Sequence, residues 1–328
     1  MADTQDSFLR TLRPQNLLVL FKTTFNEWLE DKAPQLGAAL AYYTVFSLAP
    51  LILVLLAIIG WIFRKDPAGA WNKITQQMGS FMDPSGVQVM QDIARTAAKP
   101  SAGLWATVIG VALALLGASG VFGALQDALN TIWGVKAKPG NAIWKYLRVR
   151  FLSFTMVAGV CFLLLVTLTI EAVLKGFSDY VESALPGGMA IAFSVYLFVD
   201  LLLVILLFAM MFKYLPDVTV KWRDVWVGAA VTALLFLLGK WALGLYLGSG
   251  AAGSAYGAAS SLVTLLLWIY YSSQILLFGA EFTQVYANRC GSGGTPSKHA
   301  VAIETTEEEI SKPGEKPKRG ASGPQAEL

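Results

Sequence analysis

GAASSLVTLLLWIYYSSQILLFGAEFT, residues 257–283, contains a single charged side chain, Glu281. An α-helix of this length rises about 40 Å at 1.5 Å per residue, which exceeds the roughly 30 Å thickness of the hydrocarbon core of a bilayer. Its serine, tyrosine and glutamine residues lie between long apolar runs on both sides. The stretch is therefore predicted to cross a membrane as a helix, with polar groups inside the membrane.

Five further apolar stretches have a similar length and composition. The whole chain has 328 residues, of which 55% are apolar and 14% are charged, whereas about 25% of the residues in an average soluble protein are charged. These stretches lie at residues 36–63, 104–125, 149–174, 191–214 and 225–248. The sequence predicts an all-α polytopic membrane protein, with a bundle of six transmembrane helices over residues 36–285.

The segments at the two ends of the chain are expected to lie outside the bundle. Residues 1–35 form a cytoplasmic segment, in which residues 15–30 place apolar side chains on one side of a helix. This pattern predicts an amphipathic helix along the inner leaflet, although packing of the helix on the end of the bundle explains it as well. Residues 286–328 form a cytoplasmic tail, predicted to be disordered because Gly, Ser, Pro, Lys and Glu dominate from Gly291 onward.

The outer loop, residues 64–103, carries two helix-start signals. Asp66-Pro67 and Asp83-Pro84 each place an N-cap residue before a proline at the first helical position. Two short helices are therefore predicted to lie over the outer side of the bundle. In the next span, small residues recur every four positions, which predicts close packing of that span on a neighbour: Ala106, Gly110, Ala114 and Ala118.

Several classes of chemistry are disfavoured. The only histidine, His299, lies in the polar tail, and the two cysteines, Cys161 and Cys290, do not form a disulfide framework. No phosphate-binding loop or metalloprotease motif occurs. We therefore expect no catalytic, cofactor or metal site and no enzyme activity. A net charge of +3 with scattered acidic residues also argues against a nucleic-acid partner.

Polar and ionisable residues inside the spans are the candidate functional residues. Pro50 removes a helical hydrogen bond and predicts a kink in the first span. Asp200 and Lys240 lie about 13 and 12 Å below the outer ends of their helices at 1.5 Å per residue, which predicts an intramembrane ion pair. Whether this pair is structural or lines a pathway stays open. A further set is expected to converge on one polar cavity near the inner half of the bilayer, although tyrosines near an interface are also ordinary anchors: Tyr42, Tyr43, Ser47, Gln126, Asp127, Asn130, Tyr271 and Gln274.

Three segments together resemble the YihY/BrkB family of bacterial inner-membrane proteins. They are residues 38–50 (AALAYYTVFSLAP), residues 129–133 (LNTIW) and residues 256–282, which contain LWIYY and close with GAEF. The similarity covers about residues 15–290. It implies six transmembrane helices and an envelope role that is often described as virulence-associated, and it supplies no agreed catalytic residue.

Family members have also been labelled ribonuclease BN. The sequence disfavours that activity, because metal-dependent RNA hydrolysis requires clustered ligands and a basic surface. Two hypotheses remain: a transporter or flippase-like protein for a lipid or other amphiphile, and a non-transporting scaffold or regulator of envelope assembly. Membrane lipids are the expected partners in the first case and envelope-assembly proteins in the second. The sequence decides neither the substrate nor whether the chain forms homo-oligomers.

The distribution of lysine and arginine predicts the topology. They concentrate before the first span, between the second and third spans, and between the fourth and fifth, which places both termini in the cytoplasm. In a variant lacking Cys161 and Cys290, a cysteine placed between Lys65 and Pro100 should react with an impermeant thiol reagent added outside intact cells. A cysteine near Gly140 should react only after the cells are opened, and its labelling in intact cells would contradict the topology.

Overall fold

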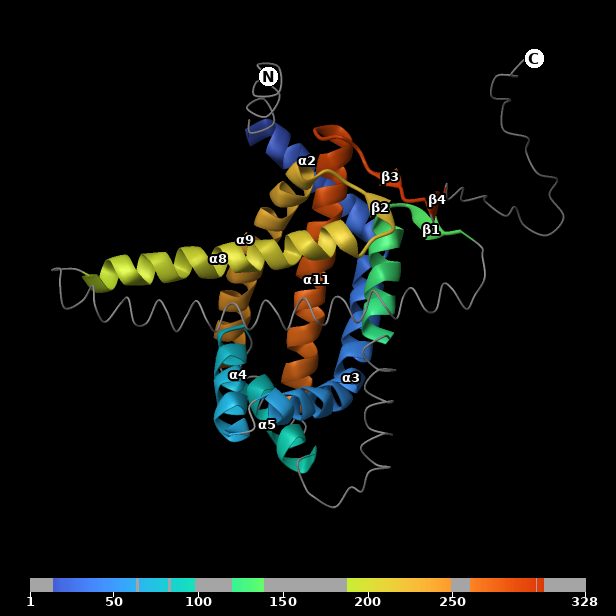
Figure 1. The fold of residues 1–328 in the computed structure, drawn as a ribbon. Coiled ribbons are helices and arrows are strands. Elements are labelled where there is room, and N and C mark those ends of the chain that lie inside the picture. Colours follow the sequence, from blue (N-terminus) through green and yellow to red (C-terminus); the bar gives the residue numbers. More distant parts are fainter. Residues whose placement is uncertain are drawn as a thin grey trace, which may run out of the picture.

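A computed structural model of the protein describes residues 14–62, 65–81, 84–97, 120–138, 188–248, 260–298 and 300–303 (Figure 1). The described part is mostly helical. The helices are α2 (Pro14–Glu30), α3 (Ala33–Ile62), α4 (Pro67–Phe81), α5 (Pro84–Ala97), a helix over residues 120–132, α8 (Gly188–Tyr214), α9 (Trp222–Gly248) and α11 (Ser260–Arg289). The strands are β1 (Val135–Ala137), β2 (Val218–Thr219), β3 (Thr295–Pro296) and β4 (Ala300–Ala302).

Three of the described helices are long and apolar enough to cross a bilayer. The crossing stretches are Leu197–Tyr214 in α8, Trp222–Leu245 in α9 and Leu262–Arg289 in α11. The first predicted span, residues 36–63, falls within α3, whereas residues 149–174 and most of residues 104–125, including the row of small residues, lie outside the described part. The molecule is therefore a helical membrane protein, and the number of six spans stays a prediction.

The helices α9 and α11 run antiparallel and approach each other through two glycines. Gly279 of α11 lies against Thr232 of α9, and Gly228 of α9 lies against Thr283 of α11, so closely that a Cβ atom on either glycine would overlap the threonine. Each threonine hydroxyl donates to the carbonyl four residues earlier in its own helix, Gly228 at 2.7 Å and Gly279 at 2.6 Å. The contact therefore buries two hydroxyls that already have acceptors, and it follows the small-residue packing that membrane helices favour.

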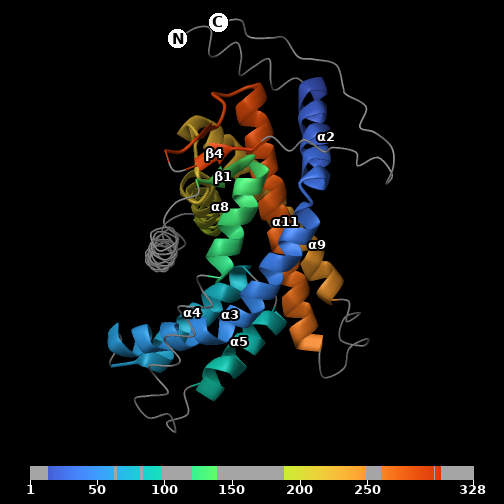
Figure 2. The same ribbon diagram turned by 90° about the vertical axis from the view of Figure 1, so that its right-hand side faces the viewer.

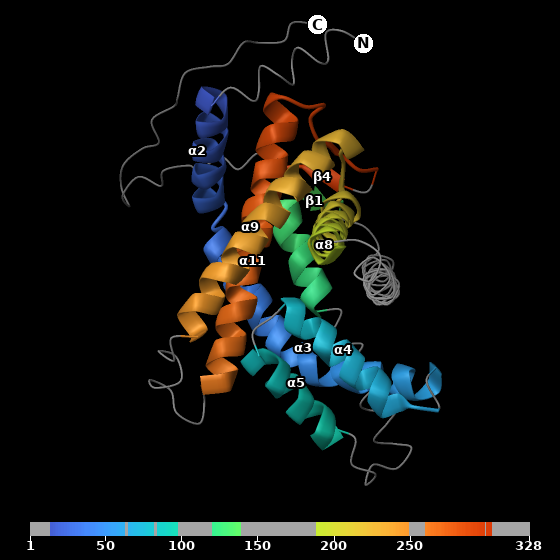
Figure 3. The ribbon, with the colours of Figure 1, turned by 90° about the vertical axis from the view of Figure 1, so that its left-hand side faces the viewer.

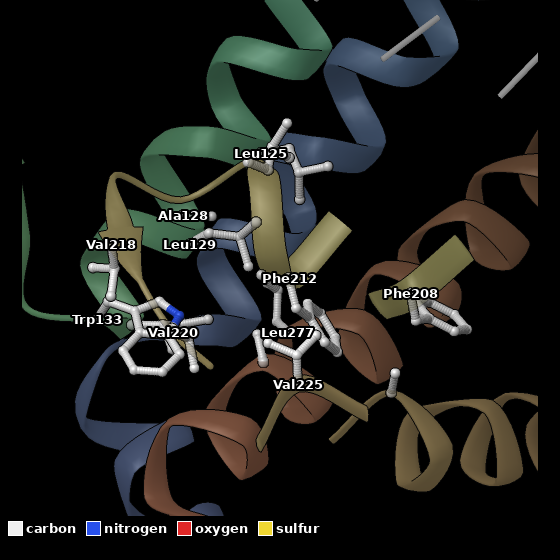
Figure 4. Close-up of a cluster of buried hydrophobic side chains, with 14 of the residues drawn as sticks. Leu125, Ala128, Leu129, Trp133, Phe208, Phe212, Val218, Val220, Val225 and Leu277 are labelled. Atoms are coloured by element: carbon white, nitrogen blue, oxygen red, sulfur yellow. The ribbon is translucent and has the colours of Figure 1, made fainter. Parts of the chain in front are cut away.

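The largest cluster of buried apolar side chains lies where α9 begins and where the helix over residues 120–132 ends (Figure 4). Leu129, Phe212 and Leu277 are buried there and come from three different helices. The helix α8 runs across α9 at a large angle (Figure 1), and the rings of Phe208 and Phe236 meet edge to face with 5.9 Å between their centroids. This cluster holds together the end of the molecule that carries the strands.

The helix α2 lies beside the C-terminal part of α11 (Figure 2). Leu20 is buried against Phe282 and Val285 of α11. A second apolar row on α2 remains exposed, at the i, i+7 and i+11 positions Leu18, Phe25 and Leu29. The helix is therefore docked on a spanning helix and also presents an apolar stripe that no described residue covers.

The two short helices predicted for the outer loop are confirmed. The helix α4 begins at Pro67, and the backbone N–H of Gly69 donates to the Asp66 carboxylate at 2.8 Å, which is an N-cap. The helix α5 begins at Pro84 and buries Met90 and Ala94 against α3 and α11. Both helices lie at the end of α11 that is opposite to the strands (Figures 2 and 3).

The prediction of disorder from Gly291 onward is wrong for residues 291–298 and 300–303, which we call the connecting segment. Its strand β3 pairs antiparallel with β2, and its strand β4 pairs antiparallel with β1. The backbone N–H of Ile303 also donates to Gly134 O at 2.8 Å. Composition missed this order because backbone pairing with two distant loops holds the segment in place, and Ala300 alone among its described residues is buried. The fold is consequently not strictly all-α, and residues 304–328 lie outside the described part.

The close contact of Gly279 with Thr232 predicts that two Gly→Leu substitutions differ strongly in their effect on the free energy of unfolding. Gly279→Leu should lower the free energy of unfolding by about 3 kcal/mol or more, because overpacking of this size forces α9 and α11 apart. Gly244→Leu is the matched control, since Gly244 lies on α9 with open space where its Cβ would be, and it should leave stability nearly unchanged. Thermal unfolding in detergent measures both variants, and equal losses would contradict the contact.

Candidate functional site

Two polar side chains lie on the face of α11 that is turned away from α9, the half-buried Gln274 and the fully buried Glu281. Because each residue of a helix turns about 100° from the last, Gln274 and Glu281 share one face, and Glu281 lies about 200° around α11 from Gly279. This face meets α3 and the turn that precedes it. We call the contact the polar seam and define it by Gln274 and Glu281 on one side and by Asp31, Pro34 and Gly37 on the other.

Gln274 occupies the middle of the polar seam. Gly37 of α3 lies directly against its side-chain amide, where a Cβ atom would overlap it. The amide nitrogen Nε2 donates to Pro34 O over a long 3.4 Å, while the buried oxygen Oε1 has no hydrogen-bond partner in the part of the chain that the structure describes. The amide is therefore held only loosely by the protein, although one end of it is shielded from solvent.

Glu281 lies about two turns further along α11, at 3.6 residues per turn. Its side chain is 0% exposed, and neither of its carboxyl oxygens accepts a hydrogen bond from a described residue. The ionisable groups that face it are Asp31 and Glu27, which are both acidic. No ion pair to Glu281 occurs within the described residues. An ionised carboxylate in such surroundings is strongly disfavoured.

The turn between α2 and α3 positions Asp31 opposite Glu281. The backbone N–H of Asp31 donates to Glu27 O at 2.8 Å, and Lys32 follows with a φ of 54°. This left-handed conformation is costly for a residue with a Cβ atom. Burial raises the pKa of the Asp31 carboxyl above its ordinary value of 3.8; hydrogen bonding with Glu281 opposes this effect, while the charges of Glu27 and Glu30 reinforce it.

A second polar cluster lies at the strand end of the molecule and is centred on the buried residue Asp217. Its carboxylate oxygen Oδ2 accepts hydrogen bonds from Gln126 Nε2 at 3.2 Å and Asn130 Nδ2 at 3.1 Å. Its backbone N–H donates to Asn130 Oδ1 at 2.7 Å, and its carbonyl accepts from the N–H of Ser297 at 2.9 Å. Asp217 thus links the helix over residues 120–132, the turn before α9 and the connecting segment. These polar groups are well satisfied, in contrast to those of the polar seam.

The eight residues expected to share one cavity lie instead in separate contacts. Gln126 and Asn130 bind Asp217, as described above, whereas Asp127 between them is exposed. Gln274 belongs to the polar seam, but Tyr271 packs against Gly239 of α9. The remaining three lie on α3: Tyr42 and Tyr43 are exposed, and the buried Ser47 donates to Thr44 O at 2.9 Å.

The structure describes the remaining candidates, Pro50 and the predicted pair of Asp200 and Lys240, only in part. Pro50 lies inside α3, and the C-terminal part of this helix runs in a different direction from its N-terminal part (Figure 1). Lys240 is half-buried on α9, while the side chain of Asp200 lies outside the described part. The helices α8 and α9 that carry them are packed together, but the ion pair stays a prediction.

Sequence reasoning did not select Asp31, Asp217 or Glu281 as site residues. Glu281 carried a signal, because it is the single charge within the stretch 257–283. The local sequence gave no such signal for Asp31 or Asp217. Each lies in a short turn and acquires its role only when distant helices pack against that turn. Among the described residues there is no group of three or more His, Cys, Asp or Glu side chains that could hold a metal ion.

Comparison with known proteins identifies the family. The model of the virulence factor BrkB family matches residues 24–304. The chain belongs to this family. The resemblance inferred from the sequence motifs is thereby confirmed. The match also extends through β4, beyond the end of α11, so the connecting segment is part of the family domain.

Several curated relatives are named UPF0761 membrane proteins. One from Tolumonas auensis is 27% identical over 266 residues, which cover 77% of this chain and 80% of the relative. One from Mannheimia succiniciproducens is 26% identical over 295 residues, 84% of this chain and 92% of the relative. One from Ralstonia nicotianae is 27% identical over 257 residues, 76% of this chain, and the match spans only 55% of that relative. No solved structure matches the chain.

The Asp217 cluster predicts that Asn130 is important for stability. Asn130→Ala removes one donor and one acceptor and leaves buried groups of Asp217 unsatisfied, which should lower the free energy of unfolding by about 1–3 kcal/mol. Thr131→Ala is the matched control, because the exposed Thr131 hydroxyl donates only to Asp127 O in its own helix, at 2.9 Å. Denaturant titration in detergent compares the two variants. A loss for Asn130→Ala no larger than for Thr131→Ala would contradict the cluster.

Proposed function

We propose that the protein is a transporter or flippase-like protein that moves a lipid or another amphiphile across the bacterial inner membrane, with both termini in the cytoplasm. The observation that carries this proposal is the polar seam. Gln274 and Glu281 lie within the spanning stretch Leu262–Arg289. Three of their four side-chain polar atoms are buried and accept no hydrogen bond from a donor among the described residues: Gln274 Oε1, Glu281 Oε1 and Glu281 Oε2.

Unsatisfied polar atoms inside a membrane protein are rare and costly. Each loses its hydrogen bonds to water, and no lipid group in the hydrocarbon core replaces them. A purely structural helix contact would be more stable with apolar residues at these positions. We therefore assign the polar seam a role in a second state, in which the packing of α11 on α3 loosens and these atoms bind water or a polar headgroup.

The exposed side chains of α9 and α2 support an amphiphilic substrate. Exposed tryptophans lie near both ends of the spanning part of α9, at Trp222 and Trp241, which are about 28 Å apart at 1.5 Å per residue. This spacing is close to the thickness of the hydrocarbon core, and tryptophan favours its two boundaries. The exposed apolar stripe of α2, with Leu18, Phe25 and Leu29, is suited to lie in the inner leaflet beside the polar seam. A headgroup could then enter the seam while its acyl chains stay in lipid.

One observation favours the alternative of a non-transporting scaffold or regulator of envelope assembly. The connecting segment pairs with two separate loops through β1 and β2, which makes the strand end of the molecule an ordered surface. Such a surface could bind an envelope-assembly protein without any movement of the spanning helices.

A substitution at Gln274 separates the two functions. Gln274→Leu removes a polar group that makes one long hydrogen bond, so the melting temperature should change little or rise. Transport of a fluorescent phospholipid in proteoliposomes should fall about tenfold, the effect of losing roughly 1.4 kcal/mol of interaction with the moving headgroup. A structural role would give the opposite pattern, with stability lost and transport per folded molecule unchanged.

The matched control is Gln35→Leu, an identical change at an exposed position in the first turn of α3. It should alter neither the melting temperature nor the transport rate. The absence of phospholipid movement by the wild-type protein, at any direction of the membrane potential, would contradict the transport proposal and favour the scaffold.

A further inference from the structure

We infer that Glu281 and Asp31 form a proton-binding site, in which one shared proton holds the turn between α2 and α3 against α11 and release of that proton loosens this contact. The inference rests on the proposed function and deepens it, because it names the proton as the ion whose binding and release switch the polar seam between its two states. Proton binding itself is measurable without any transport assay.

The geometry leaves Glu281 with only one group that can form a hydrogen bond to it. Its side chain is fully buried, and neither oxygen accepts a hydrogen bond from a backbone or side-chain donor of the described segments. The group that faces it at hydrogen-bonding range is the Asp31 carboxyl. Two ionised carboxylates offer acceptors only and repel each other. A single proton between them makes one carboxyl a donor, and the contact then becomes a hydrogen bond.

Within the described part of the chain, no cation acts on this pair of acids. On α2 and its turn, the charged groups that act on Asp31 are Glu27 and Glu30, whereas the exposed cations Lys22 and Lys32 act on neither acid. Arg223 of α9 interacts with Tyr286 instead. At the level of Glu281, α9 presents Gly228 and Thr232, which lie against the opposite face of α11. The α9 carboxylate nearest the end of α11, Asp224, is already bound to Ser292 through the backbone N–H at 2.9 Å and the hydroxyl at 2.7 Å. A proton is therefore the ligand that this site fits.

The two acids differ in their access to water. Asp31 is half-buried in the turn after α2, while Glu281 is fully buried. Protons would therefore reach Glu281 through Asp31. Loss of the shared proton leaves two negative charges between the turn and α11, which repel each other. The turn can respond at Lys32, whose left-handed φ of 54° lies where α2 and α3 can change their relative direction.

Infrared spectroscopy of the full-length protein in lipid bilayers tests the proton directly. A buried protonated carboxyl should give a C=O stretching band at neutral pH, and ¹³C labelling of glutamate or of aspartate should shift it. The band should disappear in Glu281→Gln and persist in Glu30→Gln, a control at an exposed acid on α2. Absence of the band from the wild-type protein, or its persistence in Glu281→Gln, would overturn the inference.

Asp31→Asn provides a second measurement in case Glu281→Gln fails to fold. The pKa of Asp31 is raised in the folded protein, so the protonated carboxyl contributes stability that is fully present below its unfolded value of 3.8 and is lost as the pH rises through the folded value. Asp31→Asn should therefore raise the melting temperature at about pH 8 and have little effect at about pH 3. An equal effect at both pH values would contradict the shared proton.

Transport measurements separate this inference from the proposed function. An infrared band with no phospholipid movement would support the proton site and contradict the transport proposal. Phospholipid movement that is insensitive to a pH gradient, in a protein without the band, would contradict the proton site and leave the transport proposal standing. The combined account predicts the band together with transport that a pH gradient accelerates in the wild type but not in Glu281→Gln.

Discussion

The close approach of α9 and α11 is the constraint on which the arrangement of the described helices depends. Gly228 and Gly279 each receive the threonine of the opposite helix, so the two helices fix each other in register and in rotation. Because Gly279 and Glu281 lie about 200° apart around α11, this rotation turns Glu281 and Gln274 toward α3. Two glycines at the contact between α9 and α11 thus determine where the polar side chains of α11 point.

The rotation of α11 matters because the helix lies in a bilayer, where buried polar groups cannot reach water. In a soluble protein, Gln274 and Glu281 could turn to water, but the polar seam lies within a helix that is long enough to span the membrane. Its buried oxygens must then be satisfied by protein, a proton, water or a bound headgroup. The Asp217 cluster shows that this fold can satisfy buried polar groups completely, with several hydrogen bonds around one carboxylate. The incomplete satisfaction of the polar seam is therefore a local property, and it is the reason why we place function there.

The sequence predicts what depends on local patterns. Apolar runs locate the helices, and Asp66 with Pro67 locates the start of α4 because an N-cap acts within one turn. Features that join distant segments escape such reasoning. The strand β4 pairs with β1, more than 160 residues earlier in the chain, and each strand has only three residues, too few for a recognisable pattern. The local sequence around Asp31 or Glu281 likewise does not predict a shared site, because only the docking of α2 on α11 brings the two residues together.

The most direct test of this account is the contact between the glycines and threonines of α9 and α11 in a lipid bilayer. Solid-state NMR of protein labelled with ¹³C in glycine and threonine measures it without any substitution. We predict cross-peaks that join Gly279 Cα to the Thr232 side chain and Gly228 Cα to the Thr283 side chain. Folded protein that lacks both cross-peaks would show that α9 and α11 pack through other faces, and the polar seam would then have no basis.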